Sequence, residues 1–168
     1  MKGSQGFSLI EVMITLILIV VGVLGMVTMQ SKSIQYTKSS AINSSAVIIV
    51  DDLLEILRSN REMIYTSKGE IKEGFLFSKE KGKSFSNLTC DVHTIMDVEM
   101  KPDQQLCVWA KLAQATLPGV SDEILKDEFY ITADKNKITI NIAWKVKLGE
   151  CVQALESELC PYTVDVEI

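Results

Sequence analysis

An apolar run near the start of the chain dominates its pattern of hydrophobic and polar positions. The stretch from Gly6 to Met29 reads GFSLIEVMITLILIVVGVLGMVTM, and Glu11 is its single charged residue. At ~1.5 Å rise per residue, a helix from Phe7 to Met29 would be ~34 Å long, enough to cross the ~30 Å hydrocarbon layer of a bilayer. The pattern therefore predicts a membrane helix over residues 7–29.

The helical pattern continues beyond this run. The interval from Gln30 to Ser45 is polar, and apolar residues then recur at steps of three and four, with charged residues on the other faces. No glycine occurs between Gly25 and Gly69. We therefore predict one helix from about Phe7 to Met63, whose second half packs on a domain. The apolar stripe of that second half consists of Ile42, Ala46, Ile49, Val50, Leu53, Ile56 and Leu57.

The middle of the chain gives weaker signals. Ser67 to Asn87 is rich in Gly, Lys, Glu and Ser and predicts an exposed loop, with a brief strand at Phe75-Leu76-Phe77. Leu88 to Val98 stays open between strand and helix. Asp103 can cap a helix that ends at Leu117-Pro118-Gly119, because proline and glycine together stop a helix firmly. The apolar face expected for that helix consists of Leu106, Trp109, Leu112 and Ala113.

Alternation with a period of two follows. Phe129 to Thr132 leads through a turn at Asp134 to Lys137 into the strongest strand pattern, Ile138 to Leu148, and Tyr162 to Ile168 gives a last strand. Three antiparallel strands with one apolar face need a cover, and the stripe on the long helix supplies one. The fold class predicted is α+β, a long N-terminal helix packed on a C-terminal antiparallel sheet.

Length and charge bound the possible functions. The chain has 168 residues, a formal net charge of −5, 47% hydrophobic and 23% charged residues, which suits one membrane helix and one modest acidic domain. Clustered Lys and Arg are needed to bind the phosphate backbone of a nucleic acid, so we expect no nucleic acid partner. The nearest basic group, Lys79, Lys81 and Lys83 around Glu80, is expected to be a solvated loop.

The four cysteines all follow the apolar run. An even number in an exported domain indicates two disulfides. No pair has Cys-x-x-Cys spacing, and the single histidine, His93, has no obvious ligand partners, so neither a metal site nor a cofactor is expected. Three connectivities are open, and we favour the local one. Its pairs are Cys90 with Cys107 and Cys151 with Cys160.

Glu11 distinguishes the apolar run from an ordinary membrane anchor. A secretory signal peptide would have a shorter apolar region and a small-x-small cleavage site, which Val27 to Ser31 lacks. A plain anchor fits the length, but an ionised carboxylate inside a bilayer costs ~2.5–3.5 kcal/mol and normally has a partner. The short basic leader with Lys2, then G-F-S-L-I-E-V and a long apolar helix, resembles the class III signal of type IV prepilins and pseudopilins.

This resemblance implies a processing pathway. A membrane-embedded prepilin peptidase is expected to cut after Gly6 on the cytoplasmic side and to methylate the new amino group of Phe7. Glu11 is expected to guide the subunit into a filament. The Phe7 amine lies four residues before Glu11, on the same helix face, and could neutralise that carboxylate within the chain or in a neighbouring copy.

The resemblance also implies an organisation, a location and partners. Residues 1–6 would be the leader peptide, 7–29 the helix half in the membrane or filament core, and 30–168 the periplasmic domain of a type IV pilin-like fold. The chain is expected in the bacterial inner membrane as a single-pass protein and then in the pilus at the cell surface. Expected partners are the peptidase, other major and minor pilins and the inner-membrane assembly platform, with a tip adhesin as a further candidate.

Landmarks in the C-terminal half are similar to those of PilV-type minor pilins. Trp109-x-x-Leu112, Leu117-Pro118-Gly119 and a strand from Ile138 to Trp144 follow in the same order. Those proteins usually carry a second glycine after Leu-Pro-Gly, whereas Val120 stands here. The similarity implies a minor pilin that enters or primes a type IV pilus, with twitching motility, adhesion and DNA uptake as candidate roles.

No group of residues indicates an enzyme, because no nucleophile stands beside a base and no carboxylate pair stands out. His93 is expected to be structural or solvent-exposed, and Trp109 and Trp144 are expected in the core. The chain would then be a substrate of enzymes and not an enzyme. The acidic residues that lack the spacing of a calcium loop, and are expected in a surface loop, are Asp122, Glu123, Asp127 and Glu128.

Two alternatives to the minor pilin stay open. A pseudopilin of a type II secretion system shares the signal and the helix, and would drive protein export in place of forming a surface pilus. A membrane-anchored binding module, whose acidic domain recognises a ligand independently of any filament, predicts an uncleaved leader.

Overall fold

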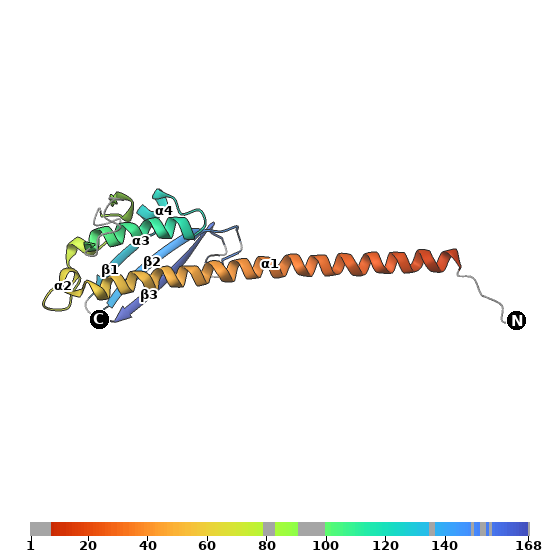
Figure 1. Ribbon diagram of the computed structural model, residues 1–168, viewed down its shortest axis with the longest axis horizontal. Coiled ribbons are helices and arrows are strands. Elements are labelled where there is room, and N and C mark those ends of the chain that lie inside the picture. Colours follow the sequence, from red (N-terminus) through yellow and green to blue (C-terminus); the bar gives the residue numbers. More distant parts are fainter. Residues whose placement is uncertain are drawn as a thin grey trace. The chain divides into compact units, whose positions relative to one another are not determined.

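The computed structural model describes residues 8–78, 83–90, 100–134, 137–148, 150–151, 154 and 156–167. The chain divides into two compact units, Met1–Ala41 and Ile42–Ile168, which are described separately below. The helix α1 (Leu9–Ser59) begins in the first unit and ends in the second (Figure 1). In the first unit the described residues from Leu9 onward form this helix, and its side chains from Leu9 to Lys38 are exposed.

The second half of α1 buries the stripe predicted from the sequence. Ala46, Ile49, Val50, Leu53 and Leu57 are buried, at the steps of three and four that keep residues on one helix face. The other two stripe residues, Ile42 and Ile56, are partly buried against the same core. The predicted stripe is therefore confirmed.

The predicted end of this helix at Met63 is wrong by one turn. The helix α1 ends at Ser59, Asn60 has φ −104° and ψ 27°, and a single turn, α2 (Arg61–Ile64), follows. The Asn60 side chain explains the break: its Nδ2 donates to the Ile56 carbonyl at 2.9 Å and to Gln105 Oε1 at 2.6 Å. Asparagine favours such local bonds over continuation of a helix.

The segment after α2 is mostly loop, as predicted, with the short 3-10 helices η1 (Glu73–Phe75) and η3 (Phe85–Asn87). The brief strand expected at Phe75-Leu76-Phe77 is reduced to one bridge, in which Phe77 exchanges backbone hydrogen bonds of 3.1 and 2.8 Å with Ile131. Of the segment that the sequence left open, residues 91–98 lie outside the described residues.

The helix α3 (Pro102–Thr116) corrects the predicted cap. Lys101 is the N-cap residue without a side-chain cap bond, and Asp103 lies in the first turn. Pro102 suits the first position because its φ is already helical and its missing N–H has no partner to lose there. Leu112 lies at the margin of the predicted face and is 47% exposed, whereas Ala110 is buried in its place.

The acidic run expected in a surface loop forms a short helix, α4 (Asp122–Asp127). Ser121 starts it, because its hydroxyl accepts a hydrogen bond from the Ile124 amide at 3.4 Å. Ile124 and Leu125 are buried, so the helix is held on one side by the core.

Three antiparallel strands form a sheet in the order β1-β2-β3. They are β1 (Tyr130–Asp134), β2 (Lys137–Lys145) and β3 (Leu159–Glu167). Ile140 is paired with Ile131 on one side and Val164 on the other. Figure 1 shows the second half of α1 and the helix α3 on one side of this sheet. The predicted α+β class is confirmed.

Two details of β2 depart from the simple alternation. The strand ends at Lys145, and Leu148, expected on the apolar face, is exposed. Asn141 and Ala143 are buried together with their apolar neighbours, so both faces of β2 are covered. The polar Asn141 is tolerated because its Nδ2 donates to the Glu128 carbonyl and its Oδ1 accepts from Thr163 Oγ1, each at 2.6 Å.

A chain of aromatic rings links the layers of the core. The ring centroids of Phe77 and Phe85 are 4.1 Å apart, those of Phe85 and Trp109 are 5.0 Å apart, and those of Trp109 and Phe129 are 6.0 Å apart. Trp109 Nε1 donates to the carbonyl of Ile49 in α1 at 2.7 Å. Trp109 and Trp144 are both buried, as expected.

Two disulfides close the second unit, Cys90–Cys107 and Cys151–Cys160. These are the pairs that the sequence favours. The first ties the segment before residue 91 to α3, and the second joins the region after β2 to the second residue of β3.

Candidate functional site: the N-terminal signal and the first helix

Glu11 lies in the first turn of α1. The carbonyl of Ser8 accepts hydrogen bonds from the amides of Glu11 at 3.0 Å and Val12 at 3.3 Å, which starts the helix. A carboxylate in the first turn is stabilised by the positive end of the helix dipole. Gly6 and Phe7, the residues at which processing is expected, lie outside the described residues. The structure therefore places Glu11 in the first turn of the helix, and in the sequence it lies four residues after Phe7.

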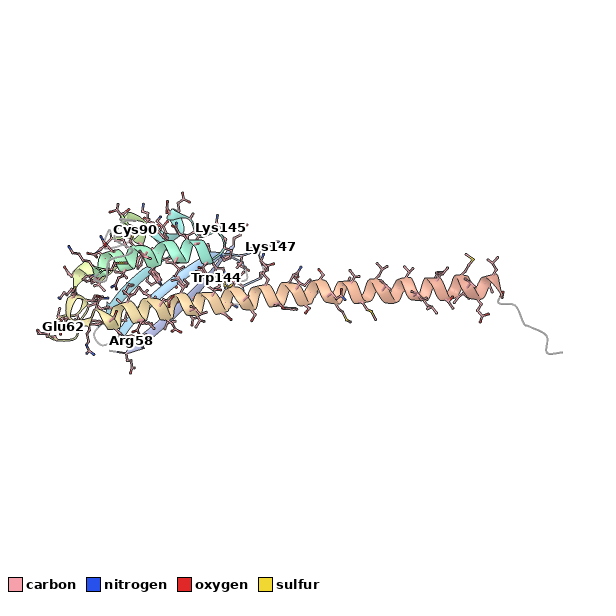
Figure 2. The ribbon with its side chains drawn as sticks, viewed as in Figure 1. Arg58, Glu62, Cys90, Trp144, Lys145 and Lys147 are labelled. Carbon is pink, nitrogen blue, oxygen red and sulfur yellow. A yellow bond between two sulfur atoms is a disulfide. The ribbon has the colours of Figure 1, made fainter. Side chains whose placement is uncertain are left out.

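The apolar side chains of the first unit are exposed throughout. Figure 2 shows side chains projecting from all round the first half of α1, and the large apolar residues from Leu9 to Met29 are between 47% and 78% exposed. Burying one such side chain contributes about 1.5–3 kcal/mol. The segment is therefore suited to lipid or to the apolar surface of other proteins.

The polar groups of this segment are satisfied within the helix. Thr15 Oγ1 donates to the carbonyl of Val12 at 2.9 Å, and Thr28 Oγ1 donates to that of Gly25 at 2.7 Å. Such internal bonds lower the cost of placing a hydroxyl in hydrocarbon. Among the described residues, α1 is the helix that is long and apolar enough to cross a membrane.

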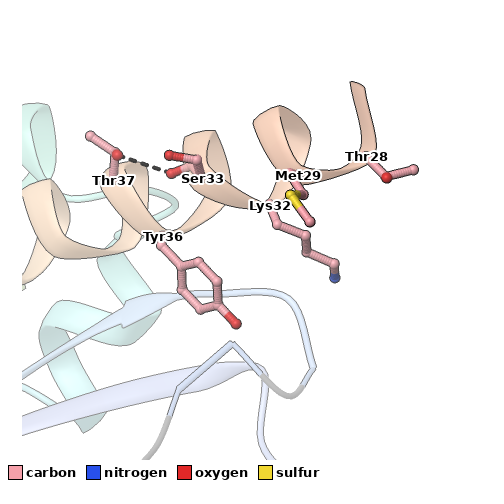
Figure 3. A pocket seen from close by; sticks show the side chains of 6 residues that line it. All are labelled: Thr28, Met29, Lys32, Ser33, Tyr36 and Thr37. Atoms are coloured by element: carbon pink, nitrogen blue, oxygen red, sulfur yellow. Dashed lines mark hydrogen bonds between the residues drawn. The ribbon is translucent and has the colours of Figure 1, made fainter. Parts of the chain in front are cut away.

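A mixed polar surface begins where the apolar run ends. Thr28, Met29, Lys32, Ser33, Tyr36 and Thr37 line a shallow region on α1 (Figure 3). Thr37 Oγ1 donates to the Ser33 carbonyl at 2.9 Å. This region was not predicted from the sequence. The signal that could have found it is the four-residue spacing of Lys32 and Tyr36, directly after the apolar run.

The remaining candidates that the structure describes form no site. His93, Lys79 and Lys81 lie outside the described residues. Lys83, expected in a solvated loop, is partly buried: its Nζ lies 4.7 Å from the Phe77 ring centroid, bonds to the Gly74 carbonyl and is 3.9 Å from Asp103 Oδ1. Within the described parts of the chain, no group of three or more His, Cys, Asp or Glu residues could hold a metal.

The helix and the sheet define an α+β protein of type IV pilin-like architecture with an exposed apolar N-terminal segment. Residues 1–27 match the family model of the prokaryotic N-terminal methylation motif, so the chain carries a type IV prepilin-like signal. No curated protein and no solved structure matches the chain. The signal indicates a substrate of the prepilin pathway that is anchored through its N-terminal helix.

Proposed function

We propose that this chain is a minor pilin, cut after Gly6, N-methylated at Phe7, and incorporated into a type IV pilus or used to start its assembly. The observation that carries the proposal is the methylation motif over residues 1–27, which includes most of the exposed apolar surface at the start of α1. The chain then acts as a substrate of the peptidase and as a structural subunit, and not as an enzyme.

The mechanism rests on the lone carboxylate of the apolar segment. Moving α1 from lipid to a bundle of other helices gains little hydrophobic free energy, because lipid tails are as apolar as leucine. Polar contacts must then select the axial register. Glu11 is the single charged residue between Leu9 and Lys32, so its pairing with a Phe7 amine, its own or a neighbour's, favours one register over the others.

The proposed location is the inner membrane, with Ile42–Ile168 in the periplasm, followed by the pilus. Proposed partners are the prepilin peptidase, the assembly platform and other pilins, with a tip adhesin as a further candidate. Lysines near the span, Lys2 before it and Lys32 and Lys38 after it, do not favour this orientation by their number. The orientation therefore rests on the signal.

The test is mass spectrometry of the intact chain and of its N-terminal peptide, from native membranes and from sheared surface filaments. The expected result is a chain that begins at N-methylated Phe7 and is present in the sheared fraction. A processed chain absent from surface filaments, with secretion lost on deletion, would point to a pseudopilin. An uncut leader would overturn the filament proposal and favour an anchored binding module.

A further inference from the structure

The surface that follows the apolar run has a defined face. Met29, Lys32, Ser33 and Tyr36 fall within about 100° of one another around α1, at 100° per residue. We call these four residues the Lys32–Tyr36 face. They are exposed, Tyr36 by 75%, and they are part of the shallow region in Figure 3. Lys38 lies on the opposite side of the helix.

The charge of this part of the helix has one sign. Residues 12–50 contain Lys32 and Lys38 and no Asp or Glu. No carboxylate of α1 therefore lies within a helical turn of either ammonium group. Lys32 is thus an uncompensated positive charge next to an apolar span, which matches a membrane boundary that carries negative charge.

The positions of these residues along the helix axis also fit a membrane boundary. Leu9 and Met29 are separated by about 30 Å of helix, which equals the thickness of the hydrocarbon layer. Lys32 lies about 4.5 Å beyond Met29 and Tyr36 about 10.5 Å beyond it. Helical side chains lean toward the N-terminus, so the lysine stem and the phenol ring reach back to the headgroup layer.

We propose that the Lys32–Tyr36 face binds the headgroup of an anionic phospholipid at the boundary of the span, an inference that rests on the proposed membrane insertion of α1. The Lys32 ammonium pairs with the lipid phosphate, the Tyr36 hydroxyl donates to a phosphate or ester oxygen, and Met29 contacts the upper acyl chain. Amphipathic tyrosines and lysines are suited to this layer, since each has an apolar body and a polar tip.

The experiment is native mass spectrometry of the full chain, purified from membranes in detergent and offered equal amounts of dioleoyl-phosphatidylglycerol and dioleoyl-phosphatidylcholine. The wild type is expected to retain phosphatidylglycerol preferentially. Lys32→Gln is expected to lower the ratio of bound phosphatidylglycerol to phosphatidylcholine about fivefold, the effect of one lysine at an anionic surface. Lys32→Arg, which keeps the positive charge, should keep the wild-type ratio. Lys38→Gln, which removes the same charge from the opposite side, should leave it unchanged.

Three results would overturn the proposal. Lys32→Gln with an unchanged lipid ratio would do so, and so would an equal loss in Lys38→Gln, which would indicate general charge attraction. If the wild type gives dimer peaks that Lys32→Gln loses at the same lipid ratio, the face would be assigned to a second copy. The intact mass in the same spectra reports whether the leader was removed, so a failure of the processing proposal is read separately.

Discussion

Gly119 adopts φ +66°, a conformation that side chains rarely take, at the end of the Leu117-Pro118-Gly119 stop. A Cβ placed there would lie 2.8 Å from Lys145 Cβ. The amide of Lys145 donates to the Pro118 carbonyl at 2.9 Å, so this close approach holds the stop against the end of β2. Only glycine fits such a contact without strain.

We expect Gly119→Ala to lower the free energy of unfolding by about 2–4 kcal/mol, from backbone strain plus the clash. Urea unfolding of the full chain in detergent, followed by tryptophan fluorescence, measures it. Gly69 has φ +85° and open space around it. Gly69→Ala should therefore lower the free energy of unfolding through backbone strain alone, by about 1 kcal/mol. Gly74→Ala, with neither problem, should be close to neutral. Equal losses in all three would contradict this explanation.

A second residue links stability to pH. Asp165 Oδ2 lies 2.8 Å from Lys137 Nζ, and its Oδ1 accepts from Thr139 Oγ1 at 2.7 Å. The hydrogen bond from Lys137, and then that from Thr139, lower the pKa of Asp165 below its ordinary value of 3.8. Because the folded pKa is the lower one, this stabilisation is present above the unfolded pKa and is lost as pH falls through the folded pKa.

Asp165→Asn should therefore show a smaller loss of stability than the wild type between about pH 6 and about pH 3. The effect is small because the group is exposed. Urea midpoints at the two pH values measure it. Parallel losses in both proteins would mean that Asp165 does not contribute to acid sensitivity.

At the scale of elements, α1 and α3 are joined by the bond from Trp109 Nε1 to the Ile49 carbonyl. Trp109→Phe keeps an aromatic ring but removes the donor, and we expect a loss of about 1–2 kcal/mol, mostly from the lost buried bond. Trp144→Phe is the matched control, since Trp144 is equally buried and no such bond is found for it among the described residues. A larger loss of unfolding free energy in the control would mean that ring volume, and not the hydrogen bond, determines the effect of Trp109→Phe.

The disulfides give a second prediction at this scale. Cys151–Cys160 closes a separation of 9 residues and Cys90–Cys107 one of 17. Loop entropy then predicts contributions of about 2.6 and about 3.1 kcal/mol. Replacing each pair by serines and comparing urea midpoints tests the order. A much larger loss for Cys151–Cys160 would indicate that packing of its buried sulfurs matters more than loop length.

The elements also mark what the sequence can and cannot predict. The stripe from Ala46 to Leu57 was predictable because one periodic face is buried by one core. The end of α1 was not, because Asn60 breaks the helix with the help of Gln105, which is 45 positions away. The burial of Asn141 and Ala143 likewise depends on tertiary contacts, which the alternation of apolar and polar residues along β2 does not predict.

At the scale of the whole molecule, the signal was predictable because its residues are contiguous. We expect Glu11→Ala to reduce recovery in sheared filaments at least about tenfold while membrane insertion is kept, since a Phe7 amine without its partner costs about 2.5 kcal/mol or more once it is enclosed in the apolar filament core. Immunoblots of membrane and sheared fractions measure it. Thr15→Ala, one turn further along, is the control. Normal recovery of Glu11→Ala would remove the basis for register selection.

The two disulfides also limit how far the chain extends under a pulling force. At about 3.4 Å per extended residue, the separations of 17 and 9 residues withhold roughly 90 Å of contour length from any force applied to the ends. β2 and β3 cannot separate fully at the end where Cys160 is paired with Trp144, because Cys151 holds that end covalently. A stretched chain thus keeps two closed loops, from which the sheet can re-form when the load is released.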